Sequence, residues 1–215
     1  MTKPLIQLAL DETDLNTALV TAKQVADSVD VIEVGTILAF AEGMGAVRML
    51  RARYPKHILV CDMKTTDAGG ILAEMAFNAG ADWITVSAAA HIATIESCKK
   101  IADYYQKEIQ IEIYGNWTFD DAQAWVDLGI NQAIYHRARD AEIAGKGWTE
   151  DDLVTMKKLS KMGLSLSITG GIVPENIYLF KDINAKAFIA GRAFTGEKGK
   201  FTVEKMRLEI DKYWS

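Results

Sequence analysis

The chain has 215 residues, of which 49% are hydrophobic and 25% are charged, with 24 lysines and arginines against 29 aspartates and glutamates. This balance is typical of a soluble globular domain and excludes an intrinsically disordered chain. The net charge of −5 and the pI of about 5.3 argue against binding to nucleic acid through overall charge.

Targeting and redox signals are absent from the sequence pattern. No apolar run approaches the roughly 18–20 residues of a membrane helix, and the first residues lack the pattern of a signal peptide. We therefore expect a cytoplasmic protein without membrane or nucleic-acid partners. Cys61 and Cys98 have neither metal-ligand nor redox spacing, which predicts two buried free thiols.

Short apolar runs alternate with longer amphipathic segments along the chain. Several of the runs are almost continuously apolar, which is typical of strands buried on both faces of a parallel sheet. The predicted strands are Leu5–Leu10, Val29–Gly35, Ile58–Lys64, Trp83–Ser87, Ile109–Tyr114, Gln132–His136, Leu164–Thr169 and Ala187–Gly191.

Helical periodicity fills most of the intervals between these strands. Thr118 and Thr149 are expected to cap helices whose first turns are acidic, and glycines such as Gly80 are expected to end others. The predicted helices are Asp14–Asp27, Ala68–Ala79, Ile92–Tyr105, Phe119–Leu128, Asp151–Met162 and Val203–Trp214.

Strands that alternate with helices require a parallel sheet, and eight strands at about 27 residues per unit favour its closure. The sequence therefore predicts one compact (β/α)8 TIM barrel over residues 1–215. An open doubly wound sheet is the alternative. It is disfavoured because the loop at 11–14 has no phosphate fingerprint, and Gly43-Met44-Gly45 lacks the third glycine of a Rossmann motif.

Charged side chains gather where the predicted strands end. Each has a simpler structural explanation, as a paired core group or a solvated rim residue. Charges inside strands are costly unless they are paired or bind metal, and the mouth of such a barrel carries the active site. Their convergence therefore predicts an active site built from Asp11, Glu33, Asp62, Lys64, Glu112, His136 and one of Arg137 and Arg139.

The residue types at this mouth indicate a chemistry. Glu33 and Asp62 suit a hard divalent cation such as Mg2+, which takes few protein carboxylates and keeps waters. Lys64, two residues after Asp62, is expected on the same strand face, where it can stabilise an enolate oxygen. Asp67 is expected to hold this ammonium in its charged form.

Two segments late in the chain predict a phosphate site. Thr169-Gly170-Gly171 and Gly191-Arg192 end the last two strands, where glycine N–H groups and an arginine fork suit a phosphate monoester. His136 titrates near neutrality and can handle a proton. Together, these groups indicate an enediolate formed from a sugar phosphate.

Four motifs carry a resemblance that covers essentially the whole chain. They are Leu8-Ala9-Leu10-Asp11, Asp62-x-Lys64-x-x-Asp67-Ala68-Gly69, Thr169-Gly170-Gly171-Ile172 and Ala190-Gly191-Arg192. They resemble the orotidine 5′-phosphate decarboxylase suprafamily. Val31–Leu38, Gln110–Glu112 and Tyr135–Ala141 are similar to its 3-keto-L-gulonate 6-phosphate decarboxylase branch, which serves bacterial L-ascorbate breakdown.

The resemblance implies a Mg2+-dependent decarboxylation that proceeds through a cis-enediolate to L-xylulose 5-phosphate. By this resemblance Glu33 and Asp62 ligate Mg2+, and Lys64 stabilises the enediolate. Asp67 is expected to reach the site from the partner subunit of a homodimer.

The resemblance also assigns the remaining site residues. His136 and Arg139 resemble the pair that holds the water which delivers a proton, and Glu112 orients nearby groups. The implied substrate contacts are Asp11 at the hydroxyls and Thr169, Gly170, Gly171, Gly191 and Arg192 around the phosphate. The end of the fourth strand, Thr85–Ala89, receives no assignment.

Three other functions are weighed against this one. Thr65-Thr66 is closer to 3-hexulose-6-phosphate synthases, which join formaldehyde to a pentulose phosphate, whereas Arg139 favours decarboxylation. A metal-free nucleotide decarboxylase is less consistent with Glu33. A non-catalytic sugar-phosphate-binding barrel is disfavoured because the charged residues Glu33, Asp62, Lys64 and Asp67 occur together.

Overall fold

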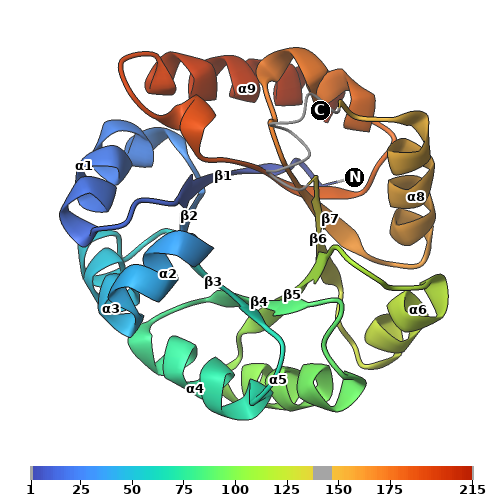
Figure 1. The fold of residues 1–215 in the computed structure, drawn as a ribbon. Helices are drawn as coiled ribbons and strands as arrows, with labels where there is room; N and C mark the ends of the chain where they lie inside the picture. Colours follow the sequence, from blue (N-terminus) through green and yellow to red (C-terminus); the bar gives the residue numbers. More distant parts are fainter. Residues whose placement is uncertain (1, 138–146, 215) are drawn as a thin grey trace.

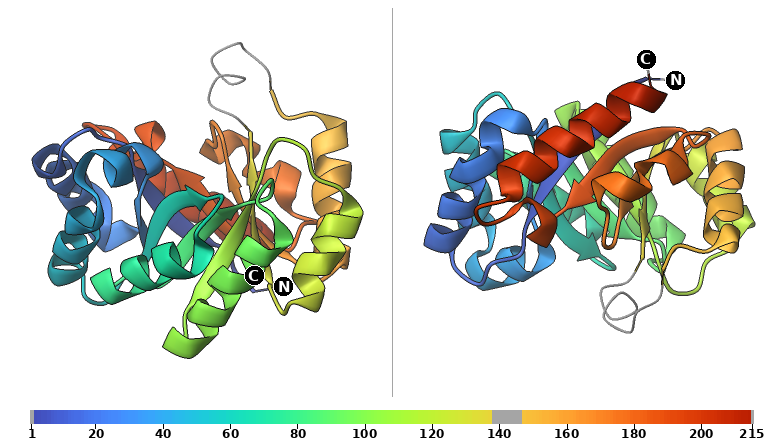
Figure 2. Two further views of the ribbon diagram at one scale, coloured as in Figure 1. Left: turned by 60° about the horizontal axis from the view of Figure 1, so that its bottom comes forward. Right: turned by 90° about the horizontal axis from the view of Figure 1, so that it is seen from above.

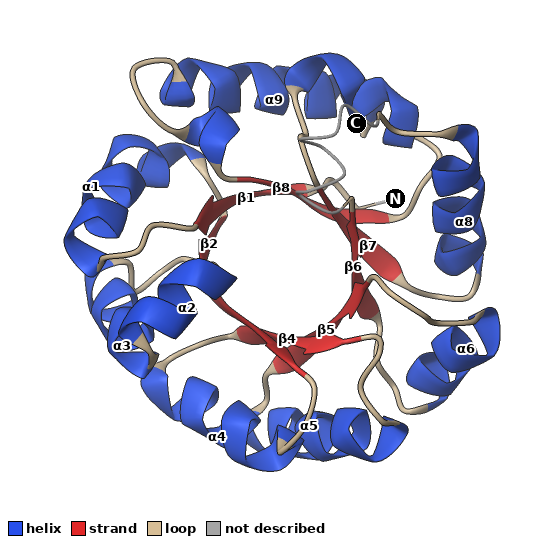
Figure 3. Ribbon diagram, in the orientation of Figure 1, coloured by secondary structure: helices blue, strands red, loops and turns tan. Residues whose placement is uncertain are grey.

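Eight parallel strands close into a barrel in chain order, with β1 hydrogen-bonded to both β2 and β8. The computed structural model describes residues 2–137 and 147–214. Figures 1 and 3 show the ring of strands enclosed by an outer ring of helices. The predicted (β/α)8 barrel is confirmed, and the open doubly wound alternative is wrong.

All eight predicted strands are present, with ends that differ from the predictions by at most two residues. They are β1 Leu5–Leu10, β2 Val31–Val34, β3 Ile58–Thr65, β4 Trp83–Ser87, β5 Glu108–Ile113, β6 Gln132–His136, β7 Ser165–Thr169 and β8 Ala185–Ala190.

The six predicted helices are also present. The helices are α1 Leu15–Val25, α2 Thr36–Glu42, α3 Met44–Arg53, α4 Gly69–Ala79, α5 Ile92–Tyr105, α6 Phe119–Asp127, α8 Glu150–Lys161 and α9 Gly199–Tyr213, with 3-10 turns η1 Ala26–Ser28, η2 Pro174–Phe180 and η3 Arg192–Phe194. Capping boxes at Thr118 and Thr149 confirm the predicted starts of α6 and α8. Gly80 ends α4 in the left-handed region.

Helices α2 and α3 and the η2 turn were not predicted. Gly43, with φ of 57°, ends α2 and precedes α3, so the chain changes direction inside a segment that lacks a continuous helical pattern. Within the described part of the chain, no helix is long and apolar enough to span a membrane. Figure 2 shows the two chain ends side by side at one end of the barrel.

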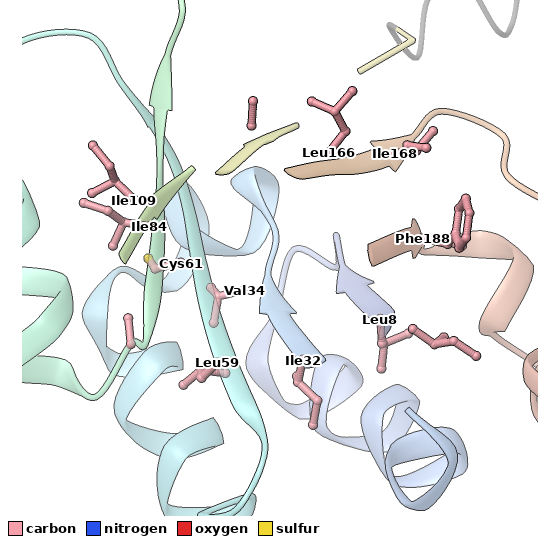
Figure 4. Close-up of a cluster of buried hydrophobic side chains, with 14 of the residues drawn as sticks. Leu8, Ile32, Val34, Leu59, Cys61, Ile84, Ile109, Leu166, Ile168 and Phe188 are labelled. Atoms are coloured by element: carbon pink, nitrogen blue, oxygen red, sulfur yellow. The ribbon is translucent and has the colours of Figure 1, made fainter. Parts of the chain in front are cut away.

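Alternate strand positions face different environments. Apolar residues such as Leu8, Ile32 and Ile84 are fully buried in the core shared by strands and helices (Figure 4). The positions between them include buried polar side chains that bond inside the barrel. Gln110 on β5 donates to Gln132 on β6 at 3.0 Å and to Ser167 on β7 at 3.3 Å. Because β5 and β7 are not neighbours in the sheet, the last bond crosses the interior.

A charged cluster ties three strands together near their amino-terminal ends. Asp82, just before β4, accepts hydrogen bonds from the Leu59 N–H at 2.9 Å, from Lys107 Nζ at 2.6 Å and from Arg51. Burial opposes the ionised form of Asp82. The hydrogen bonds from Lys107 and Leu59, with the charge of Arg51, outweigh burial and lower the pKa of the carboxyl. Arg51 also donates to the carbonyl of Gly80 at 2.8 Å.

The Asp82→Asn substitution is expected to lower the free energy of unfolding at pH 7 by about 1–3 kcal/mol, because it leaves buried donors poorly paired. A depressed carboxyl pKa stabilises the fold above the ordinary value of 3.8, and this contribution is lost as pH falls through the folded-state pKa. The difference between variant and wild type should therefore shrink toward about pH 3 in urea unfolding.

Asp182→Asn is the matched control, since Asp182 pairs with Lys157 on the surface and its side chain is 59% exposed. We expect this change to cost less than about 0.5 kcal/mol at either pH. Equal effects of the two substitutions would contradict the structural role of Asp82.

Candidate active site

One cavity of about 570 Å3 opens at the carboxyl ends of the strands. Eleven of the thirteen predicted site residues line it, and they come from strands on both sides of the barrel and from the segments that follow them. They are Asp11, Glu33, Asp62, Lys64, Glu112, His136, Thr169, Gly170, Gly171, Gly191 and Arg192. Asp67 is not among the lining residues, and Arg139 lies outside the described residues.

A chain of short polar contacts connects three strands across the cavity. Lys64 Nζ on β3 lies 2.6 Å from Asp62 Oδ2 and 2.9 Å from Glu112 Oε1 on β5. The same Glu112 oxygen lies 2.6 Å from His136 Nδ1 on β6. Glu112 therefore orients both the ammonium and the imidazole, which fixes Nδ1 of the ring against the carboxylate.

The charge of Lys64 is stabilised by its two carboxylate neighbours. Burial alone would lower the pKa of the ammonium. The charges and hydrogen bonds of Asp62 and Glu112 outweigh burial and raise the pKa of Lys64 above its ordinary value. The side chain is therefore a cation throughout the neutral range, as electrostatic stabilisation of an anion requires.

The prediction that Asp67 holds Lys64 within one chain is wrong. Asp67 is exposed, and its Oδ1 accepts the N–H of Ala68 at 2.7 Å. The reason lies in the local backbone, because β3 contains an irregularity between Cys61 and Thr65 and Lys64 has φ of 47°. This conformation directs Lys64 to Asp62 and Glu112, while Asp67 follows the end of the strand.

The two predicted metal ligands are buried and differ in protonation. Burial, followed by the charges of Asp62 and Asp11, raises the pKa of Glu33 well above its ordinary value. Burial would also raise the pKa of Asp62, but the Lys64 charge and hydrogen bonds from Lys64 and two threonines lower it. Gln7 Nε2 donates to Glu33 Oε2 at 2.5 Å.

The donor set suits a hard cation. Glu33 and Asp62 supply carboxylate oxygens, and Asp11 adds negative potential at Glu33. Within the described residues no group of three His, Cys, Asp or Glu side chains is arranged around a common metal position. Two carboxylates, with waters and substrate oxygens in the remaining positions, match the coordination that Mg2+ prefers.

Asp11 is held close to a glycine that the sequence reasoning did not assign to the site. A Cβ at Gly35 would lie 2.4 Å from Asp11 Oδ1 and 2.6 Å from the Leu10 carbonyl oxygen. The Gly35 N–H also donates to that carbonyl at 2.9 Å. Any larger residue at position 35 would therefore displace the Asp11 carboxylate.

The loops after β7 and β8 form the opposite side of the cavity. Gly170 and Gly171 have φ of 103° and 64°, and a Cβ at Gly170 would lie 2.2 Å from the Arg137 carbonyl oxygen. Arg192 begins the η3 turn. Backbone N–H groups at such turns, with an arginine, are suited to a phosphate. Arg137 itself stacks on Trp148, with its Cζ 5.0 Å from the ring centroid.

Two threonines that were not predicted bind Asp62. Thr36 Oγ1 donates to Oδ2 at 2.5 Å, and Thr85 Oγ1 donates to Oδ1 at 2.6 Å. With Gln7, they are polar residues next to the buried carboxylates. The available signal was a polar residue within an apolar run, as at Gln7 and Thr85, but that pattern does not identify the bonding partner.

Comparisons with known proteins agree with this geometry. Residues 4–206 match the model of the orotidine 5′-phosphate decarboxylase / HUMPS family. A probable 3-keto-L-gulonate-6-phosphate decarboxylase from Haemophilus influenzae is 56% identical over the full length of both chains.

Solved structures extend the comparison. The crystal structure of 3-keto-L-gulonate-6-phosphate decarboxylase from Vibrio cholerae has 68% identity and a TM-score of 0.96, with both chains fully covered. KGPDC from Streptococcus mutans, solved with a bound phosphorylated sugar, has 40% identity and a TM-score of 0.96, again over both full chains. A 3-hexulose-6-phosphate synthase from Salmonella typhimurium has 28% identity and a TM-score of 0.90, with 97% of this chain and 99% of the other covered.

These similarities confirm the resemblance that the sequence motifs indicated. The matched region spans all eight strands and every cavity residue described above. The chain belongs to the orotidine 5′-phosphate decarboxylase / HUMPS family.

Proposed function

We propose that this chain decarboxylates 3-keto-L-gulonate 6-phosphate to L-xylulose 5-phosphate and CO2 in bacterial L-ascorbate breakdown. The observation that carries the proposal is the arrangement of Lys64, Asp62, Glu112 and His136 in one cavity with an anion-binding side. Full-length relatives that bear this enzyme name support the assignment as a carboxy-lyase.

The acidic pair provides a place for the proposed Mg2+ cofactor. Glu33 and Asp62 would hold the ion, and the raised pKa of Glu33 reflects the negative charge that a cation there would offset. When bound, Mg2+ would supply Lewis acidity toward substrate oxygens beside the bond that breaks.

The proposed substrate is a β-keto acid, so the electrons of the broken C–C bond pass to the ketone and give a cis-enediolate while CO2 leaves. The Lys64 ammonium supports the negative charge that develops on this oxygen pair. Because Asp62 and Glu112 keep Lys64 charged and fixed, little reorganisation is needed as that charge appears.

A proton must then be added to the enediolate carbon to give the product. His136 lies in the cavity with Nδ1 against Glu112, which leaves Nε2 of the ring as the nitrogen able to bond a water or the substrate. We propose that His136 holds the water that delivers this proton, together with Arg139.

The opposite side of the cavity would bind the rest of the substrate. Asp11 is proposed to accept from sugar hydroxyls, and Arg192 to pair with the phosphate. The turn residues Thr169, Gly170, Gly171 and Gly191 surround the same space. This division places the phosphate away from the carboxylates of Glu33 and Asp62, so that like charges stay apart.

We also propose a homodimer in which Asp67 serves the partner's site. The exposed position of Asp67 supports this, since its carboxylate is outside its own cavity. Helices α2 and α4 carry exposed apolar side chains that suit a subunit interface. Phe40 is 81% exposed and Ile71 is 67% exposed.

The sister activity, 3-hexulose-6-phosphate synthesis, is the second candidate. The shared fold and the Thr65-Thr66 pair favour it, but the identity to a solved synthase is 28% against 68% to a solved decarboxylase. Arg139 is present in the sequence, as expected of the decarboxylase branch.

Purified protein with 3-keto-L-gulonate 6-phosphate and Mg2+ is expected to release CO2. EDTA should abolish the release, because the substrate oxygens then lack their Lewis acid. Lys64→Ala should lower kcat by at least about 1,000-fold, because a cation opposite the developing charge is lost. Lys157→Ala is the control, since Lys157 is a surface lysine paired with Asp182. No CO2 release, or release that survives both treatments, would refute the proposed reaction.

Subunit complementation tests the contribution of Asp67. Asp67→Asn and Lys64→Ala subunits are each expected to be inactive alone, whereas a mixed dimer contains one intact site. Random co-assembly should therefore restore roughly a quarter of wild-type activity, since half the dimers are mixed and each has one working site of two. Activity that stays at the level of the single variants would show that Asp67 does not act across an interface.

A further inference from the structure

Thr85 lies between the two residues at the centre of the proposed chemistry. It belongs to β4, the strand whose end received no assignment from the sequence, and its side chain is fully buried. Its hydroxyl donates to Asp62 Oδ1 at 2.6 Å and accepts the backbone N–H of Lys64 at 2.9 Å. One small side chain therefore contacts both Asp62 and Lys64.

The backbone of β3 makes this contact necessary. Cys61 pairs with Ile84 and Thr65 pairs with Val86, so residues 62–64 all face the single position of Thr85. An extra stretch of this kind loses its regular ladder partners. The Thr85 hydroxyl takes the place of a ladder carbonyl for the N–H of Lys64.

Lys64 also has an unfavourable backbone conformation. Its φ of 47° is left-handed, which is uncommon for a residue with a long side chain and persists only where the surroundings enforce it. The N–H bond to Thr85 fixes the backbone end of Lys64, and the contacts to Asp62 and Glu112 fix its ammonium.

The hydroxyl also determines which way the Asp62 carboxylate turns. A hydroxyl has one proton, so donation to Oδ1 leaves a lone pair for the Lys64 N–H. With Oδ1 engaged, Oδ2 is the oxygen directed to Lys64 Nζ at 2.6 Å and to Thr36 at 2.5 Å. Loss of the hydroxyl would release the backbone of Lys64 and the rotation of Asp62 together.

We propose that Thr85 is a positioning residue, whose hydroxyl sets both the left-handed conformation of Lys64 and the orientation of the Asp62 carboxylate. Its kinetic consequence rests on the proposed decarboxylation, whereas its structural consequence does not depend on any activity. The two are therefore tested separately.

The experiment compares three variants of the full chain. Thr85→Val removes the hydroxyl with little change of volume, and Thr85→Ser retains it. Thr65→Val is the matched control, because Thr65 is buried beside Lys64 and its hydroxyl has no hydrogen-bond partner within the described part of the chain. Thr85→Ala provides a second hydroxyl-free variant if the valine variant does not fold.

For CO2 release, Thr85→Val is expected to lower kcat by roughly 30-fold to 100-fold, with a smaller change in KM, because displaced catalytic groups cost about this much. Thr85→Ser and Thr65→Val should stay within about threefold of wild type. Wild-type kcat in Thr85→Val and Thr85→Ala, or equal losses in all three main variants, would overturn the proposal.

Crystal structures of the wild-type protein and the Thr85→Val variant provide the readout that is independent of activity. The variant is expected to move Lys64 out of the left-handed region or to rotate Asp62, while Thr65→Val retains both. If Lys64 and Asp62 are unchanged in Thr85→Val, the proposal is wrong. If the wild type releases no CO2, the proposed function fails, and these structures alone decide the role of Thr85.

Discussion

The Lys64 ammonium lies between two carboxylates that the barrel has largely removed from water, and the rest of the mouth depends on this charge balance. An unpaired charge is costly at such a position, so Asp62, Lys64 and Glu112 stabilise one another. Glu33 remains on the acidic side, where its raised pKa reflects the excess of negative charge. The pocket is therefore balanced at Lys64 and suited to a cation at Glu33.

Closure of the barrel brings these charges together. Glu33, Lys64, Glu112 and His136 belong to β2, β3, β5 and β6, and their side chains share one space only because the sheet curves back on itself. Beneath them, the bond from Gln110 on β5 to Ser167 on β7 spans the same interior. The polar floor and the charged mouth thus have one origin, since the inward position of each strand alternates with an apolar outward one.

Much of this arrangement could be predicted from the sequence, since apolar runs predict the strands and residue types at their ends predict the mouth. The partner of Lys64 could not. Strand alternation suggested a regular β3 with Asp67 nearby, but the irregularity at 62–64 redirects the ammonium to Glu112. Thr85 escaped notice for a related reason, because threonine is common in strands and sequence does not show where a hydroxyl points. Helices α2 and α3 were missed because Gly43 divides their pattern.

The strained backbone of Lys64 connects these features. A left-handed lysine is maintained here by three contacts, to Thr85 at its N–H and to Asp62 and Glu112 at its ammonium. The strand ends one residue later, and the chain continues through an exposed Asp67 to a left-handed Ala68 before α4 begins. The same segment thus turns a cation into its own cavity and leaves a carboxylate outside it. A second copy of the chain is the partner to which such a carboxylate would be useful, because the neighbouring mouth has the same cation to address.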